Sequence, residues 1–137
     1  MKILLLEDDL NRIREFEKRV NELNERNTFK THSNPVTLIH TETAIECIRL
    51  LKTEHFNLIL LDHDLGGKVF VDTNREDTGS EVARWISNNL QSVKGVPIIT
   101  HTQNPAGAKN IISLVPGCIH VPFIWEKNKF HNIIKVK

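Results

Sequence analysis

Residues 58–64 read Leu58-Ile59-Leu60-Leu61-Asp62-His63-Asp64. Four consecutive aliphatic residues followed at once by polar ones are typical of a strand that is buried on both faces and ends abruptly. A carboxylate at the end of such a strand is costly unless a cation or hydrogen-bond donors accompany it. The stretch therefore predicts a central parallel strand with a functional group, Asp62, at its carboxyl end.

The rest of the chain alternates apolar runs with helical patterns, which is typical of a parallel α/β sheet. Right-handed crossover connections favour the strand order 2-1-3-4-5. The other predicted strands are Ile3–Leu6, Val36–His40, Val96–Thr100 and Cys118–Val121. The predicted helices are Leu10–Glu25, one that carries Ala44 to Leu51 behind a threonine cap at Thr41 or Thr43, Thr78–Leu90 and Asn104–Leu114.

Length and composition indicate one domain, residues 1–137, in which the tail 123–137 is a strand or a helix end. The chain has 137 residues, of which 39% are hydrophobic and 26% charged, with a formal net charge of +1. This balance gives no strong signal for nucleic acid. The apolar run that follows Met1 is too short for a signal peptide or a membrane span. We expect a cytoplasmic protein with buried thiols at Cys47 and Cys118, and an oligomer is compatible with the sequence.

Polar and charged residues collect just after the predicted strands. Because the carboxyl ends of parallel strands share one edge, and ligands bind there where the strand order reverses, we expect these residues to form one site. They are Glu7, Asp8 and Asp9 after the first strand, Asp62, His63 and Asp64 after the third, Thr100, His101 and Thr102 after the fourth, and His120 at the fifth.

Structural roles compete with functional ones at several of these positions. Asp8 or Asp9 can cap the first long helix, where carboxylates are favoured. Asp64 can belong to a turn. His101 and His120 can be ordinary polar residues at a sheet edge.

The residue types at this edge suit phosphate chemistry with a hard cation. Glu7, Asp8 and Asp62 are candidate ligands for Mg²⁺, with Mn²⁺ as an alternative, and a shared ion requires the carboxylates of Asp8 and Asp62 to lie roughly 4–6 Å apart. Histidines near neutral pH serve as acids, bases or ligands, which makes His63, His101 and His120 candidates beside Asp62. The helix start at Asn104 favours phosphate, and we assign phosphate or nucleotide binding to Thr100, Thr102, Asn104, Gly107 and Gly79.

Three segments together resemble the receiver domains of two-component response regulators. Leu4 to Asp9 is similar to their first strand and acidic pair, Leu58 to Asp62 to the strand that ends in their phospho-accepting aspartate, and Ile98 to Thr100 to the strand that ends in their hydroxyl residue. The resemblance covers roughly residues 1–122. It implies a flavodoxin-like, three-layer α/β sandwich.

Departures from the receiver pattern point to a divergent branch. Receivers carry a lysine directly before a proline after the fifth strand, whereas Val121 precedes Pro122 here. The strings at residues 61–66, Leu-Asp-His-Asp-Leu-Gly, and 101–107, His-Thr-Gln-Asn-Pro-Ala-Gly, resemble a receiver-like family of bacteria and phages that is proposed to process cyclic phosphates. In that family the added histidines imply a phosphoesterase-like centre.

The leading hypothesis is therefore phosphoesterase-like processing of a cyclic phosphate or cyclic nucleotide, assisted by a metal. The ligand would be a small-molecule phosphate or nucleotide. Two alternatives stay open: a module that binds and sequesters a nucleotide without cleaving it, and a degenerate receiver that acts through protein contacts. Incubation with cyclic nucleotides, with and without divalent cations, separates the three.

The orientation of the histidines is a further expectation. Side chains alternate along a strand, so Asp62 and His63 face opposite ways unless the chain turns. We expect the turn announced by Gly66-Gly67 to bring His63 over the same pocket as Asp62 and His101, with His120 at its margin.

Overall fold

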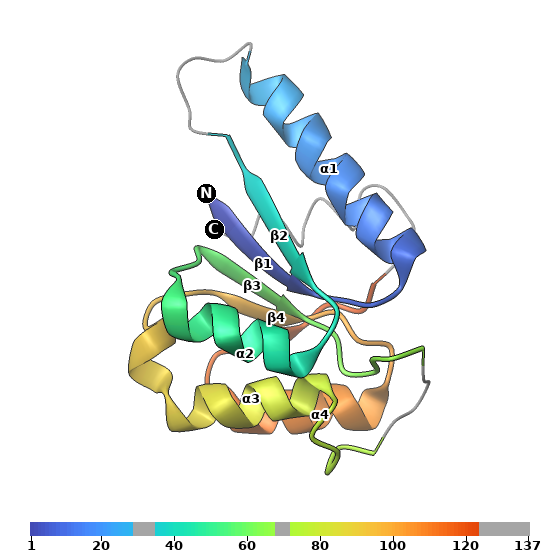
Figure 1. Cartoon of the computed structure of the whole chain (residues 1–137), viewed down its shortest axis with the longest axis vertical. Helices are drawn as coiled ribbons and strands as arrows, with labels where there is room; N and C mark the ends of the chain where they lie inside the picture. The colour runs from blue at the N-terminus through green and yellow to red at the C-terminus, as the bar shows by residue number, and fades with distance from the viewer. Residues whose placement is uncertain (29–34, 68–71, 124–137) are drawn as a thin grey trace.

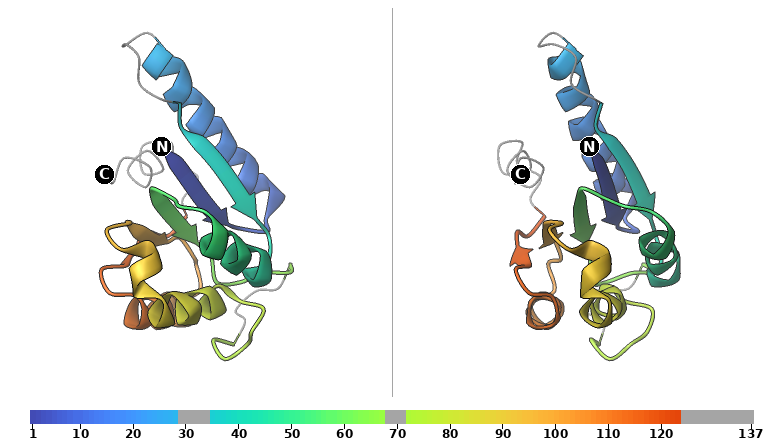
Figure 2. Two further views of the ribbon diagram at one scale, coloured as in Figure 1. Left: turned by 60° about the vertical axis from the view of Figure 1, so that its left-hand side comes forward. Right: turned by 90° about the vertical axis from the view of Figure 1, so that its left-hand side faces the viewer.

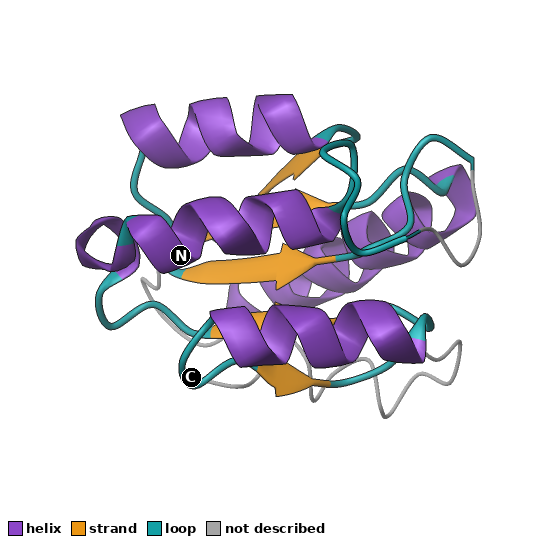
Figure 3. Ribbon diagram, turned by 90° about the horizontal axis from the view of Figure 1, so that it is seen from below, coloured by secondary structure: helices purple, strands orange, loops and turns teal. Residues whose placement is uncertain are grey.

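A five-stranded parallel sheet forms the centre of the computed structural model, which describes residues 1–28, 35–67 and 72–123. Its order is β2-β1-β3-β4-β5, as predicted. The arrowheads of the strands point the same way, and the loops that follow them gather at one edge (Figure 3). The strands are β1 (Lys2–Leu6), β2 (Thr37–Thr41), β3 (Leu58–Leu61), β4 (Ile98–Thr100) and β5 (Ile119–His120).

Helices cover both faces of this sheet and complete the predicted three-layer sandwich. Helix α1 lies on one side, and α2, α3 and α4 lie on the other (Figures 1 and 2). The described helices are α1 (Leu10–Thr28), α2 (Ala44–Thr53), α3 (Gly79–Asn88), the short 3₁₀ helix η1 (Leu90–Val93) and α4 (Pro105–Leu114). The predictions for residues 124–137 lie outside the described part of the chain.

The hydrophobic core is divided by the alternation of side chains along the strands. Odd positions of β1 and even positions of β3 face α1, where they pack with Phe16 and Val20. The intervening positions face α2, α3 and α4. The α1-facing set in the strands is Ile3, Leu5, Leu58, Leu60 and Ile99, and the opposite set is Leu4, Leu6, Ile59, Leu61 and Ile98. This alternation decides which way the first residue after each strand points.

Local signals place most helix starts correctly. The side chain of Thr43 accepts a hydrogen bond from the backbone N–H of Glu46 and so caps α2. Asn104 caps α4, with Pro105 in its first turn. Leu10, the first residue of α1, is exposed.

The segment between α3 and β4 differs from its prediction. Helix α3 ends at Asn88, and η1 follows it. The backbone N–H of Val96 donates to the carbonyl of Val93, and Gly95 has a positive φ of 77°. The chain is still turning at Val96, so β4 begins at Ile98 and not at Val96. Across the described residues, no helix has both the length and the apolar character that crossing a membrane requires.

Candidate functional site

Three ionisable residues form one row across the carboxyl edge of the sheet. Leu6 pairs with Leu61, and Leu61 pairs with Thr100, so the next register row contains Glu7, Asp62 and His101. The strand ladder reaches this row, because the N–H of Asp62 donates to Leu6 and that of His101 donates to Leu61. Each side chain continues the α1-facing alternation. The sheet therefore sets Glu7, Asp62 and His101 side by side on one face.

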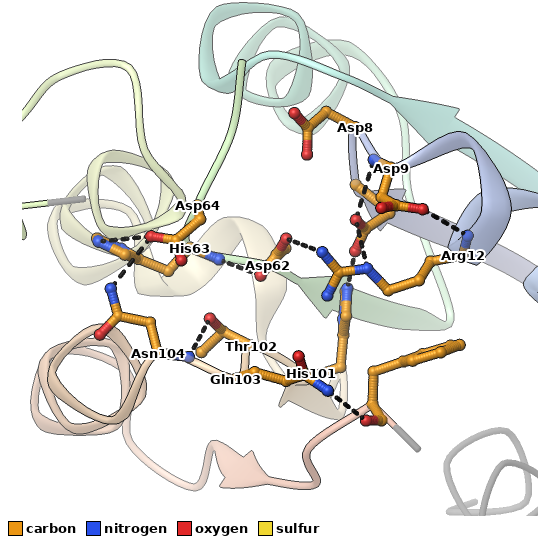
Figure 4. A network of polar contacts seen from close by, with 12 residues as sticks. Asp8, Asp9, Arg12, Asp62, His63, Asp64, His101, Thr102, Gln103 and Asn104 are labelled. Carbon is orange, nitrogen blue, oxygen red and sulfur yellow. Dashed lines mark hydrogen bonds and ion pairs between the residues drawn. The ribbon is translucent and has the colours of Figure 1, made fainter. Parts of the chain in front are cut away.

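The row is buried and internally connected. Glu7, Asp62 and His101 are 0%, 1% and 0% exposed, so none of them is an ordinary surface group. His101 Nε2 lies 2.7 Å from Glu7 Oε2, and the ring of Phe16 meets the imidazole edge-on at 5.2 Å between centroids. Figure 4 shows His101 beneath the Arg12 side chain, at the point where α1 begins.

Arg12 supplies a positive charge to this row and was missed by the sequence predictions. Its Nε lies 3.2 Å from Glu7 Oε1, and its Nη2 lies 3.9 Å from Asp62 Oδ2. The guanidinium carbon also stands 5.9 Å from the centre of the Phe123 ring. A signal was present, because Arg12 precedes Phe16 by four residues and so shares the helix face that packs on the sheet.

Two buried polar atoms of the row lack a hydrogen-bond partner among the described residues: Asp62 Oδ2 and His101 Nδ1. The other Asp62 oxygen, Oδ1, accepts from the N–H of His63 at 2.8 Å. The 3.9 Å approach of Arg12 to Oδ2 is an ion pair at the limit of contact, not a hydrogen bond. Buried unsatisfied atoms are rare and costly, which makes them good indicators of a missing ligand.

A divalent cation fits this donor set. One ligand atom from each of Glu7, Asp62 and His101 lies within 4.8 Å of the other two. Two carboxylates suit Mg²⁺ or Mn²⁺, and the imidazole moves the preference toward Mn²⁺ and other transition metals. The buried acidic and histidine group can thus hold a metal, and it contains two of the three predicted ligands, Glu7 and Asp62.

Burial also raises the pKa of Asp62, to about 6. The charges of His101 and Arg12 oppose this rise in the pKa, whereas the neighbouring carboxylate of Glu7 adds to it. Few carboxyl groups in proteins have a pKa this close to neutrality, and those that do are concentrated at functional sites.

The neighbouring aspartates take local roles. Asp8 is half-buried, and its Oδ2 accepts from the N–H of Gly67 at 2.6 Å, which ties it to the loop after β3. Asp9 caps α1, because its Oδ1 accepts from the N–H of Arg12. The capping alternative for Asp9 is therefore confirmed. A role for Asp8 in cation binding stays a prediction.

His63 occupies the opposite face of the sheet from Asp62. The expected turn back over the pocket does not occur, since the alternation of Ile59 and Leu61 continues through His63. Its Nδ1 lies 2.9 Å from Ser80 Oγ in α3, and its Nε2 lies 4.0 Å from Asp64 Oδ1. In Figure 4 the rings of His63 and His101 lie on either side of Asp62. The expectation that these two imidazoles share a pocket is corrected here.

His120 also lies away from the row. It pairs in register with Thr100, so it faces the α4 side of the sheet, whereas His101 faces α1. It is exposed, and its Nε2 lies 2.7 Å from the carbonyl oxygen of Thr102. The imidazole that reaches Asp62 from these strand ends is therefore that of His101.

The two glycines assigned to phosphate binding permit close packing. A Cβ on Gly79 would stand 1.6 Å from the carbonyl oxygen of Asp62, and one on Gly107 would stand 2.4 Å from the ring of His63. Glycine is required at both places because α3 and α4 begin directly against the end of β3.

The polar residues assigned to phosphate binding have internal partners. Thr100 Oγ1 donates to the carbonyl of Leu61, and Thr102 Oγ1 accepts from the N–H of Asn104. Asn104 Oδ1 accepts from the N–H of Gly107, while its Nδ2 donates to Asp64 Oδ1. The first turn of α4 is thus already capped by the protein, and phosphate binding there stays a prediction.

The sheet order, the helices on both faces and an aspartate at the end of the central strand define a receiver domain. A family model described as the cyclic-phosphate processing receiver domain matches residues 3–116. The chain belongs to this family. A comparison with curated proteins finds no match.

Solved receiver structures share the fold at low sequence identity. The phosphorylated cyanobacterial phytochrome response regulator RcpA superposes with a TM-score of 0.69 at 18% identity, covering 96% of this chain and 87% of that one. The chemotaxis response regulator CheY4 of Vibrio cholerae has a TM-score of 0.69 at 10% identity, covering 98% and 95%. The Mn²⁺-bound response regulator Rcp1 has a TM-score of 0.61 at 23% identity, covering 96% and 88%.

Proposed function

We propose that this receiver-like domain hydrolyses a cyclic phosphate, such as a cyclic nucleotide, at the row formed by Glu7, Asp62 and His101. The observation that carries the proposal is a pair of buried atoms that have no hydrogen-bond partner among the described residues, Asp62 Oδ2 and His101 Nδ1, at the carboxyl edge of the sheet. The carboxylate oxygen of Asp62 can bind a metal ion, and the imidazole nitrogen of His101 can act as a base. The family to which the chain belongs supports the same class of ligand.

The charges of the row explain why a cation is needed. With His101 neutral, Glu7 and Asp62 contribute two negative charges and Arg12 one positive charge, which leaves one net negative charge. This charge repels a phosphate diester. A bound divalent cation, Mg²⁺ or Mn²⁺, reverses the sign and supplies neutralisation at the phosphoryl oxygens.

Arg12 is the group that we assign to phosphate capture. It is the least buried member of the cluster, with 19% of its side chain exposed. Its guanidinium presents several donors in a plane that matches phosphate oxygens. In receivers a lysine fills the cationic role, but Val121 stands at that place here. Arg12, arriving from α1, would replace that positive charge from another direction.

His101 is the group that we assign to proton transfer. In this assignment the carboxylates of Glu7 and Asp62 would hold the cation and His101 would not. Nε2 of His101 then carries the proton and donates to Glu7, and the lone pair of Nδ1 is free to accept a proton from an attacking water. The carboxylate of Glu7 then stabilises the imidazolium. The leaving oxygen lies opposite the attacking water and stays attached to the substrate, so it takes its proton from solvent, and the imidazolium returns its own proton to solvent. The sum is one water added and one phosphate ester bond broken.

A second candidate function is ligand capture without cleavage. The observation that favours it is the burial of the row, since at most 1% of Glu7, Asp62 or His101 is exposed and water must be admitted before hydrolysis. A degenerate receiver that works through protein contacts is the remaining alternative, because the receiver lysine is missing.

One experiment separates these functions. The protein is incubated with 2′,3′-cyclic and 3′,5′-cyclic nucleotides, with Mg²⁺, with Mn²⁺ or with a chelator, and the nucleotides are analysed before and after the protein is denatured. The proposal predicts a linear phosphomonoester product that forms with the cation and not with the chelator. Intact ligand released only by denaturation supports capture instead. Neither product nor captured ligand contradicts both and favours the degenerate receiver.

A further inference from the structure

A cavity of about 550 Å³ opens at the start of α2, on the face of the sheet opposite to the one that the row's side chains face. This volume is within the range of small-molecule sites. Its walls come from the start of α2 and from the loop after β3, and it is lined by Glu42, Thr43, Ala44, Ile45, Leu65, Gly66, Glu76 and Asp77. All of these residues belong to the described part of the chain.

The sheet order brings two walls of this cavity close to the carboxyl end of β1. β1 lies between β2 and β3, so the residues after β2 and those after β3 stand on either side of Asp8, which follows β1. The hydrogen bond from the N–H of Gly67 to Asp8 joins this loop to the β1 end, one residue beyond the wall residue Gly66. Figure 4 shows Asp8 beside this loop and above Asp62. The loop that forms one wall of the cavity is thus bonded to the residue that follows Glu7.

The cavity has an apolar floor. Leu65 and Ala44 are buried there. Ile45 is 80% exposed, far more than any other large hydrophobic residue among the described ones. An isoleucine this exposed in the first turn of a helix gains nothing for the fold, whereas a flat ligand placed against it would remove its surface from water.

The rim of the cavity is acidic and open to hydrogen-bond donors. Glu42 and Glu76 have neither hydrogen bonds nor ion pairs within the described residues. Asp77 is already bound by Arg75 at 2.8 Å. Carboxylates accept hydrogen bonds and offer none. They repel the phosphate end of a ligand and attract a neutral part that carries N–H groups.

We propose that this cavity binds the nucleobase of the ligand, and that it selects bases with an exocyclic amino group. The base lies against Ile45 and Leu65, and its amino group donates to Glu42 or Glu76. Adenine, guanine and cytosine carry such a group. Uracil offers a single N–H between two carbonyl oxygens, which the carboxylates repel. This inference rests on the proposed function, because it assumes that the phosphate of the same ligand occupies the row.

The test uses ligands that separate the base from the phosphate. Adenosine, guanosine, cytidine and uridine, which have no phosphate, are titrated calorimetrically into the full chain. The expected result is that the amino-bearing nucleosides bind at least about fivefold more tightly than uridine. Glycerol 1,2-cyclic phosphate, which has no base, is compared as a substrate with nucleoside 2′,3′-cyclic phosphates. Its kcat/KM is expected to be lower than theirs by a factor of about ten or more.

Matched variants assign the effect to the cavity. Ile45→Ser removes the exposed apolar contact without disturbing the core, and Ile112→Ser, at a second exposed isoleucine on α4, is its control. Glu42→Gln supplies both a donor and an acceptor, and Glu17→Gln on α1 is its control. We expect Ile45→Ser to weaken nucleoside binding about fivefold or more. We expect Glu42→Gln to reduce the discrimination against uridine, and both controls to behave as the parent.

The outcomes distinguish the cavity from the chemistry. Nucleosides that bind with the expected preference while no cyclic phosphate is turned over support the cavity and contradict the proposed hydrolysis. Equal turnover of the base-free and nucleoside substrates, unaffected by Ile45→Ser, supports hydrolysis and overturns the cavity proposal. Nucleoside binding that Ile45→Ser and Glu42→Gln both leave unchanged also overturns it.

Discussion

At the scale of single residues, Asp62 carries the largest conflict between folding and function. Its pKa is raised to about 6 chiefly because the carboxyl is buried, so the folded chain favours the protonated form. Ionisation of Asp62 therefore lowers the free energy of unfolding. This penalty is absent below about pH 4, grows between about pH 4 and 6, and is complete above about pH 6. An aliphatic residue at this position would not lower the free energy of unfolding in this way, so the presence of Asp62 indicates a functional role.

Replacing Asp62 by asparagine should stabilise the metal-free protein. The shift of the pKa from 3.8 to about 6 corresponds to a gain of up to about 3 kcal/mol at pH 7 to 8. The gain should shrink as the pH falls and approach zero below about pH 3, where Asp62 is protonated in both states. Denaturant unfolding in the presence of chelator measures it, with the exposed Glu17→Gln as control. A variant that is less stable than the parent at pH 8 would show that Asp62 is structural.

Replacing Arg12 should have opposite effects on metal affinity and on turnover. Its charge lies beside the carboxylates of Glu7 and Asp62, so it competes with a metal ion there. Arg12→Gln should bind Mn²⁺ about threefold to tenfold more tightly, because a nearby positive charge is removed. The same variant should lose turnover of cyclic phosphates. The exposed Arg14→Gln, on the same helix, is the control for both measurements. Unchanged Mn²⁺ affinity in Arg12→Gln would place the cation elsewhere.

At the scale of elements, α4 packs closely against the end of β3 near the site. Gly107 in α4 leaves room for the ring of His63, which is fully buried and lies within hydrogen-bond reach of Ser80 in α3. Two helices and a strand end thus meet around one imidazole. This arrangement gives His63 a packing role, in contrast to the role of His101.

Gly107→Ala should destabilise the protein by about 2 kcal/mol or more, because the added methyl group overlaps the ring of His63 and the buried surroundings cannot yield. Ala106→Gly, at the adjacent exposed position of α4, should cost about 1 kcal/mol or less. The double variant Gly107→Ala with His63→Ala should recover part of the loss. Thermal unfolding measures all three. A Gly107→Ala protein as stable as the parent would mean that α4 can move away from β3.

The strand pattern made the fold predictable from the sequence. Unbroken aliphatic runs end at Leu6 and Leu61, and in a chain with helices between them such runs indicate buried parallel strands. The right-handed connections then favour the observed strand order. The boundary at Val96 was missed, because the turn around Gly95 depends on a backbone hydrogen bond that no residue pattern announces.

The site was predictable in part. The register makes Glu7, Asp62 and His101 neighbours, and their clustering follows from strand ends alone. The predicted orientation of His63 was wrong. A turn after Asp62 was expected to bring its ring onto the same face, but the side-chain alternation of β3 continues through His63. Arg12 was overlooked because charged residues on a surface helix are usually solvated. Its spacing to Phe16 was the signal that could have identified it.

At the scale of the whole molecule, the chain has the receiver architecture without the receiver's cationic lysine. Val121 stands before Pro122, where the resemblance places that lysine. The positive charge near Asp62 comes from Arg12 in α1, on one side of the sheet. A fold that elsewhere carries phospho-signalling thus surrounds Asp62 with different partners here.

Acetyl phosphate or beryllofluoride should therefore give no stable adduct at Asp62. An acyl phosphate needs a cation held at the lysine position, and Asp62 instead faces the imidazole of His101. Intact-mass spectrometry after incubation with acetyl phosphate and Mg²⁺ tests this, with RcpA, whose structure is that of a phosphorylated form, treated in parallel as a positive control. A stable phosphorylated form of the parent that is absent in Asp62→Asn would restore the signalling interpretation.

The most direct test of the central claim is the turnover of a nucleoside 2′,3′-cyclic phosphate by the parent, His101→Asn and His55→Asn, followed by phosphorus NMR in the presence of Mn²⁺. His55 is exposed and lies outside the row. We predict that His55→Asn matches the parent and that His101→Asn loses about a hundredfold or more in rate, because the proton-transfer group is gone. Equal rates for all three proteins, or no hydrolysis by the parent, would contradict the account.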